Sequence, residues 1–355
     1  MNPIWKPEER PDDQLKNLYR AYGYIPYKMS RFEEYDLYVR NKDFLVSDQI
    51  ITFSDRSGRL LAMKPDVTLS IVKNAPEAPG VVQKVYYNEN VYRDYREIQQ
   101  TGLECVGDLG DYEIAEVVLL AAKSLQKLGG RWVLEVSHMG LLAAVLDSSG
   151  LNREEQRQAM EYLHRKNFHQ LKALCGKGSA WDKLSAVAAC RGGREALEQI
   201  ANVMTTEEER RELQQLKDLW SILEASGFAD SVRLDFSVGN NMRYYSGVVF
   251  RGYLEGIPAS VLSGGQYDKL PRKMGRKAKA IGFAVYLDLL QNRNVREDAF
   301  DVDTLILHDG SADPLVLTAA AEEAAAKGTV LVTRELPADR SWKQLLRFEK
   351  GAWVK

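Results

Sequence analysis

The stretch VYRDYREIQQTGLECVG, residues 91–107, carries the features on which the assignment of the fold depends. It continues VVQKVYYNEN, residues 81–90, and the two stretches contain the β-branched and aromatic side chains that are typical of strands. Only Asp94 and Tyr95 stand between the two strand candidates. We therefore predict two long strands joined by a very short turn.

A second hairpin and a helix are predicted upstream of these strands. Residues 51–68, ITFSDRSGRLLAMKPDVT, predict a hairpin whose turn is the polar cluster 55–58. A helix is expected from Asp66 to Ala75, and either Asp66 or Thr68 can cap its first turn.

Helical patterns dominate the middle of the chain. Residues 111–128 show apolar side chains at helical spacing and are followed by two glycines, which end helices readily. Residues 139–228 are charged and rich in Ala, Leu and Glu, and we interpret them as a helical insertion. Within them, Thr206 followed by Glu209 is typical of a capping box.

Strand patterns return after the insertion, in VRLDFSV, MRYYSGVVFRGYL and ASVLSGG between residues 232 and 265. IGFAVYLDLL, residues 281–290, is predicted as a helix. The last part of the chain shows a strand at 304–307, an Ala-rich helix near 314–327 and a strand at 329–332. These three elements predict a small α/β unit.

Hairpin-connected strands and helices in separate runs indicate an α+β fold with an antiparallel sheet flanked by helices, rather than alternating β and α elements. We expect one core over residues 1–295, with the helical insertion at about 139–228, and a small C-terminal α/β unit over 296–355. No P-loop is present, and no G-x-G-x-x-G motif follows a strand.

Composition excludes several classes of protein. The 355 residues are 45% hydrophobic and 28% charged, and the formal net charge of -2 gives no general attraction to nucleic acid. No apolar run approaches the roughly 18 residues that span a bilayer, so we expect a cytoplasmic protein. Three cysteines without C-x-x-C spacing and isolated histidines predict no disulfide, no metal site and no cofactor.

Four segments together resemble the histidyl-tRNA synthetase family, in that family's order and over roughly residues 5–290. LAMKPDVT (61–68) resembles its hairpin-to-helix motif, and residues 91–107 resemble class II motif 2. MRYYSGVVF with the following SGGQYDKL resembles the histidine signature, and residues 281–290 resemble motif 3. The resemblance implies a class II aminoacyl-tRNA synthetase-like core.

The departures from that family concern the groups that handle ATP. The long motif 2 loop is reduced to a two-residue turn. Asn240 and Leu289 stand where the family has an arginine of the histidine signature and the arginine of motif 3, and Gln266 replaces a third arginine. Ser30 stands at the motif 1 proline. Because adenylate formation depends on positive charge around the α-phosphate, we assign no catalytic residue.

The resemblance also implies a retained amino-acid pocket. Its acids and phenols suit an ammonium group and an imidazole N–H, and its arginine suits a carboxylate. The residues that match pocket positions of the family, and so imply a histidine site, are Asp66, Thr68, Arg93, Gln100, Glu104, Tyr244, Tyr245 and Tyr267.

A synthetase core with this pocket and without these arginines resembles the family of ATP phosphoribosyltransferase regulatory subunits. That resemblance implies a non-catalytic, dimeric protein of the first step of histidine biosynthesis. It would bind histidine, activate a short-form catalytic subunit and relay histidine feedback to it, and no tRNA or membrane partner is expected. Two other hypotheses stay open, namely a divergent histidine–tRNA ligase and a synthetase-like ligase that charges another acceptor.

Overall fold

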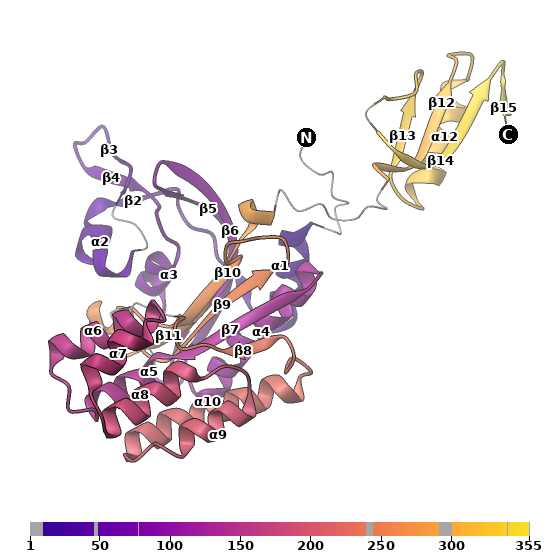
Figure 1. The fold of residues 1–355 in the computed structure, drawn as a ribbon. Coiled ribbons are helices and arrows are strands. Elements are labelled where there is room, and N and C mark those ends of the chain that lie inside the picture. Colours follow the sequence, from indigo (N-terminus) through magenta and orange to yellow (C-terminus); the bar gives the residue numbers. More distant parts are fainter. Residues whose placement is uncertain are drawn as a thin grey trace. The chain divides into compact units, whose positions relative to one another are not determined.

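The computed structural model describes residues 10–45, 49–76, 78–238, 244–290, 300–338 and 340–354. These belong to two compact units, one of residues 11–290 and a second that includes the described residues from 300 onward (Figure 1). The domain organisation expected from the sequence, a core over 1–295 and a unit over 296–355, is retained as a proposal.

The larger unit is built on an eight-stranded sheet (Figure 1). Neighbouring strands are antiparallel except for the parallel pairs β1–β5 and β7–β8 at the two edges. This arrangement confirms the predicted α+β class. In spatial order the strands are β1 (Ile25–Pro26), β5 (Val82–Arg93), β6 (Arg96–Gly107), β11 (Lys279–Tyr286), β10 (Leu262–Gln266), β9 (Val248–Leu254), β7 (Trp132–His138) and β8 (Val232–Leu234).

The hairpin β5–β6 has the predicted two-residue turn. Its two strands pair from Val82↔Gly107 to Arg93↔Arg96, so twelve residues on each side are in register. Asp94 and Tyr95 take φ angles of 51° and 60°. Positive φ at both central residues is the geometry of a type I′ turn, one of the two favoured two-residue hairpin loops, whose twist matches that of the flanking strands.

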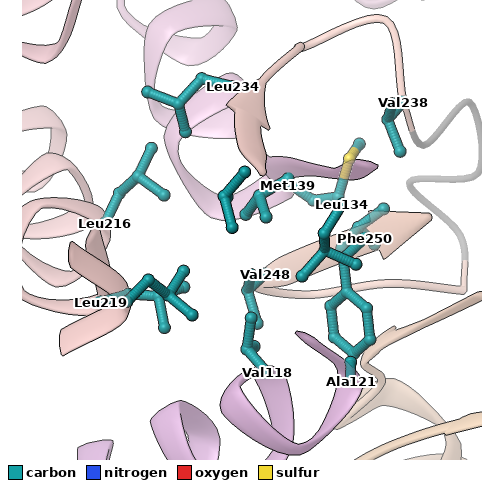
Figure 2. Close-up of a cluster of buried hydrophobic side chains, with 14 of the residues drawn as sticks. Val118, Ala121, Leu134, Met139, Leu216, Leu219, Leu234, Val238, Val248 and Phe250 are labelled. Atoms are coloured by element: carbon teal, nitrogen blue, oxygen red, sulfur yellow. The ribbon is translucent and has the colours of Figure 1, made fainter. Parts of the chain in front are cut away.

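One face of the sheet is covered by α4 (Asp111–Leu128), with α1 (Pro11–Ala21) and α10 (Glu207–Ala225) packed beside it. Figure 2 shows part of the resulting core. A buried Leu or Phe in such a cluster contributes about 1.5–3 kcal/mol to stability. The labelled side chains include those of α4 (Val118, Ala121), α10 (Leu216, Leu219), β7 (Leu134) and β9 (Val248, Phe250).

The insertion is helical, as predicted. Its other helices are α5 (Met139–Asp147), α6 (Arg153–His164), α7 (Phe168–Cys175), α8 (Ser179–Ala189) and α9 (Arg194–Ala201). The capping box of α10 is confirmed, since Thr206 Oγ1 accepts from Glu209 N at 3.2 Å and the Glu209 carboxylate accepts from Thr206 N at 2.9 Å. Buried Lys183 also donates to Glu209, at 2.7 Å.

A smaller three-stranded sheet, in the order β2 (Phe32–Glu34), β4 (Leu60–Met63), β3 (Thr52–Ser54), contains the predicted hairpin of residues 51–68. Its turn is held by Asp55 Oδ1, which accepts from Ser57 N at 2.8 Å and Arg59 N at 2.9 Å. The short helices beside it are α2 (Tyr35–Arg40), the 3-10 turn η2 (Lys42–Phe44) and α3 (Thr68–Asn74).

The prediction of a helix at 281–290 is wrong. Residues up to Tyr286 form β11, in the middle of the large sheet, and only Leu287–Leu290 turn, as the 3-10 helix η3. β11 lies between β6 and β10 and is covered on both faces, so its sequence is almost continuously apolar. A short apolar run of this kind does not distinguish a buried strand from a helix by its periodicity.

The C-terminal unit is a four-stranded sheet with one helix, α12 (Pro314–Ala325). β12 (Val302–His308) pairs in parallel with β13 (Val330–Thr333) and with β14 (Trp342–Glu349). β15 (Ala352–Val354) pairs antiparallel with β14 at the edge of the sheet. The first two strands and the helix were predicted. β14 and β15 were not, because their mixed, partly exposed side chains show no clear alternation.

Candidate functional site

The central strands of the large sheet carry small residues on the face opposite α4. Gly102 on β6 pairs with Ala284 on β11, and Gly282 on β11 pairs with Gly265 on β10. An added Cβ at Gly282 would overlap the carboxyl group of Glu104. The small residues therefore leave room above the middle of the sheet for larger side chains that reach in from its edges.

A cavity of about 510 Å³ lies on this face. It is lined by all eight residues that the sequence predicted for the site, namely Asp66, Thr68, Arg93, Gln100, Glu104, Tyr244, Tyr245 and Tyr267. They come from the start of α3 and the residues before it, from the last residue of β5, from the interior of β6, and from the segments before β9 and after β10. The structure thus brings together residues that are up to about 200 positions apart, as a ligand site requires.

Glu104 lies at the centre of the cavity wall and is almost fully buried. It accepts a hydrogen bond from Thr68 Oγ1 at 2.8 Å and a second from the hydroxyl of Tyr267. Burial raises the pKa of Glu104 to about 8; the two hydrogen bonds lower it and nearby Asp66 raises it further. Without a cation beside it, this carboxyl group is therefore largely protonated at neutral pH.

Asp66 and Arg93 form a second charged group in the wall. Asp66 Oδ1 accepts from Leu69 N at 3.0 Å, so this side chain serves the first turn of α3 as predicted. Its Oδ2 lies 3.9 Å from the Arg93 guanidinium, whose Nε donates to the carbonyl of Pro65 at 2.6 Å. Burial raises the pKa of Asp66, and the charge of Arg93 opposes that rise.

Gln100 and the tyrosines complete the wall. Gln100 Oε1 is buried and accepts no hydrogen bond from any residue that the structure describes. Tyr244 packs edge-on against Tyr245 with ring centroids 4.6 Å apart, and its ring lies 5.6 Å from that of Tyr267. Burial holds the pKa of Tyr267 well above its usual value, so its hydroxyl remains a donor.

Of the three positions at which another residue replaces a family arginine, the structure describes Gln266 and Leu289. Asn240 lies outside the described residues. Leu289, in η3, packs against the main hydrophobic core. Gln266 donates its amide to Asp268 at 2.8 Å, so its polar end is engaged within the protein.

Other lining residues were not predicted. They include Tyr87 on β5, Tyr286 on β11, and Arg251 and Ser263 on β9 and β10. The strand patterns alone contain the alternation that places a side chain on one face, but they do not specify which strands are neighbours. Only the register of the sheet shows that these side chains share the face of Glu104.

The described part of the chain contains no cluster of three His, Cys, Asp or Glu side chains that could hold a metal ion. In the same residues, no helix is both long enough and apolar enough to cross a membrane.

Comparison with known proteins accounts for this architecture. The family model described as histidyl-tRNA synthetase matches residues 3–290. The chain belongs to the histidyl-tRNA synthetase family. This confirms the resemblance that the four sequence segments carried.

Curated relatives within the histidyl-tRNA synthetase family share a name. A protein of Clostridium acetobutylicum is 26% identical over 84% of this chain and 78% of its own, and one of Syntrophotalea carbinolica is 29% identical over 83% and 74%. Each is called ATP phosphoribosyltransferase regulatory subunit.

Solved structures show the same fold. A protein of Bacillus halodurans described as an ATP phosphoribosyltransferase regulatory subunit/histidyl-tRNA synthetase superposes with a TM-score of 0.75 at 24% identity, covering 96% of this chain and 94% of that one. A chain of the ATP phosphoribosyl transferase (HisG:HisZ) complex from Thermotoga maritima superposes with a TM-score of 0.62 at 18% identity, covering 80% and 98%.

The raised pKa of Glu104 predicts how stability changes with pH. A carboxyl group whose pKa is higher in the folded than in the unfolded state holds its proton longer when folded, so stability falls as pH rises from about 4.5 to about 8. Urea unfolding at a series of pH values gives the free energy of unfolding across that range. We expect Glu104→Gln to remove the part of its decrease that Glu104 causes. Exposed Glu154→Gln is the control. A Glu104→Gln profile parallel to that of the wild type would contradict the assigned protonation.

Proposed function

We propose that this chain is a non-catalytic regulatory subunit of ATP phosphoribosyltransferase and that it binds histidine in the cavity above the sheet. The observation that carries the proposal is the convergence of eight polar and aromatic side chains on one cavity of the size of a small-molecule site. The names of the relatives and the partner present in the Thermotoga maritima complex support the regulatory role.

The chemistry of the wall suits histidine. Glu104 and Asp66 offer carboxyl oxygens to an imidazole N–H or an ammonium group, and a cation beside Glu104 would favour its ionised form. Arg93 suits a carboxylate. The unsatisfied Gln100 Oε1 is an acceptor that an ammonium group could meet, since a buried acceptor without a donor is costly. The rings of Tyr244 and Tyr267 present faces against which an imidazole can pack.

The non-catalytic assignment rests on what surrounds this pocket. Transfer of a carboxylate to the α-phosphate of ATP needs positioned positive charge, and loss of one such donor typically costs about 10²–10³ in rate. Leu289 offers an apolar side chain to the core at the motif 3 position. The turn at Asp94 and Tyr95 leaves no loop that could extend over a triphosphate.

A histidine–tRNA ligase is the second candidate, favoured by one observation. The family model that matches residues 3–290 is that of the ligases. The amino-acid pocket alone suits both candidates, so the groups that handle ATP discriminate between them.

Histidine binding is the first test. We expect calorimetry to show one histidine site, and Glu104→Ala to weaken it by roughly 1–3 kcal/mol, because a buried imidazole or ammonium group would lose its acceptor. Glu97→Gln, on the exposed part of the same strand, is the matched control and should bind as the wild type does. Equal binding of unrelated amino acids would contradict the assigned specificity.

The partner is the second test. Mixed with the short-form ATP phosphoribosyltransferase of the same organism, the chain should co-elute with it on gel filtration and raise the rate of phosphoribosyl-ATP formation. A ligand can regulate only through a difference in affinity between two states, and coupling of about 1–3 kcal/mol gives a 5- to 150-fold effect. A transferase that is equally active alone, with no complex formed, would rule out the regulatory role.

We also propose a homodimer that uses the segment of residues 20–53, as the class II resemblance implies. Apolar side chains around the small sheet are exposed, among them Phe32, Val39 and Phe53, and the rings of Phe32 and Phe53 pack together 5.0 Å apart. A stable dimer buries about 1,200–2,000 Å² in total.

Light scattering should give the mass of a dimer for the wild type and of a monomer for Phe32→Glu, because a charge in an apolar interface is costly. Phe168→Glu, at a similarly exposed position of α7, should leave the dimer intact. A monomeric wild type at micromolar concentration would refute this assembly.

A further inference from the structure

A second cavity, of about 230 Å³, lies on the opposite face of the large sheet, the face that α4 covers. Its floor is a row of residues at the ends of three strands. His138, the last residue of β7, is the register partner of Val248, the first residue of β9, and Gln266 ends β10 beside them. Because side chains alternate between the faces of a strand, Tyr267 lines the cavity of the proposed histidine site while Gln266 lines the second cavity.

Two helices form the walls of the second cavity. α4 contributes Ile114 and Ala115 from the start of the helix, and α10 contributes Leu219 and Ile222 from its last turns. These side chains offer no hydrogen bond, so the body of a ligand that fills the space between them must itself be apolar.

The inner end of the second cavity carries a hydrogen-bond donor, the buried His138. Its Nδ1 accepts from Leu141 N at 3.1 Å, which caps α5. Burial lowers the pKa of His138 to about 4, so the ring is neutral at neutral pH and carries its proton on Nε2. Nε2 makes no hydrogen bond with any residue in the described ranges. Its N–H is therefore left for an acceptor atom inside the cavity.

The mouth of the second cavity carries two exposed carboxylates, Asp111 of α4 and Asp218 of α10. Asp218 Oδ1 accepts a hydrogen bond from the amide of Gln214 at 2.8 Å. Among the residues that the structure describes, neither carboxylate has an ion-pair partner. Two carboxylates that share one opening and lack a cation favour a positively charged group there.

The order of these groups along the second cavity decides the kind of ligand. A lysine or arginine side chain of another protein would enter with its charged end first, and that end would meet the N–H of His138, donor against donor. The acids lie at the mouth and the donor lies at the inner end. This order suits a free small molecule whose cationic group stays at the mouth.

We propose that the second cavity binds a small primary amine with an apolar body and an acceptor oxygen at the end remote from its ammonium group. The His138 Nε2–H donates to that oxygen, and Asp111 and Asp218 bind the ammonium group. The proposal is independent of the proposed function, because it involves neither histidine nor the transferase.

Calorimetry on the full chain tests this site with tyramine, a phenolic amine, and with two probes that each lack one of its polar groups. Phenethylamine lacks the oxygen, and p-cresol lacks the ammonium group. We expect tyramine to bind at least about tenfold more tightly than either, because hydrogen bonds to a buried donor and to a charged group are each worth about that factor. No binding of tyramine at millimolar concentration, or binding no tighter than that of the other two probes, would overturn the proposal.

Two exposed positions at the mouth locate the site. Asp218→Asn should weaken tyramine binding by about threefold, the effect of an exposed ion pair, and should leave p-cresol unaffected. Ile222→Trp should weaken both probes, because the larger side chain narrows the opening. Glu207→Gln, at an exposed position of α10 outside the cavity lining, is the matched control and should bind every probe as the wild type does. Thermal unfolding checks that the variants fold.

Tyramine titrations in the presence of excess histidine separate the two cavities. Tyramine should bind whether or not histidine is present, because the two ligands occupy opposite faces of the sheet. Competitive displacement of tyramine by histidine would overturn the site, as would Asp218→Asn and Ile222→Trp variants that both bind tyramine as tightly as the wild type does. A wild type that binds tyramine but no histidine would refute the proposed function and leave this site standing.

Discussion

The buried carboxyl group of Glu104 is the constraint on which the site depends. Removing a carboxyl group from water is costly unless it is hydrogen-bonded or protonated, and here both apply. Its partners Thr68 and Tyr267 come from α3 and from the segment after β10, so these hydrogen bonds tie two other parts of the chain to one strand of the sheet. Gly282 must lack a side chain for this arrangement to exist. The cavity therefore lies on one face of the sheet, above its central strands.

The hydrogen bonds of Glu104 also connect a ligand in the cavity to α3, to β6 and to the segment after β10. A cation beside Glu104 would convert its carboxyl group from the protonated to the ionised form at a point where α3, β6 and the segment after β10 meet, without requiring any ATP-handling group. Such a change can favour one of two packings of these elements, and a ligand shifts the equilibrium by the difference between its affinities for the two. Under the proposed function, a pocket that binds an amino acid can therefore serve regulation without ATP-handling groups.

Much of the fold could be predicted from local patterns. The short turn at Asp94–Tyr95, the helix at 111–128 and the capping box at Thr206 each depend on neighbouring residues alone. The segment 281–290 was assigned as a helix because a strand covered on both faces has no alternation to show. The site was predicted only where motifs resembled a family, whereas Arg251 and Tyr286 belong to it through strand register, which no local pattern contains.

The central claim is that the chain binds histidine without activating it. Histidine-dependent exchange of pyrophosphate into ATP measures that step directly on the pure protein. The account predicts no exchange above background at histidine concentrations that saturate the site by calorimetry. Exchange at about 1 per second or faster, a rate typical of working enzymes, would contradict it and make the chain a ligase.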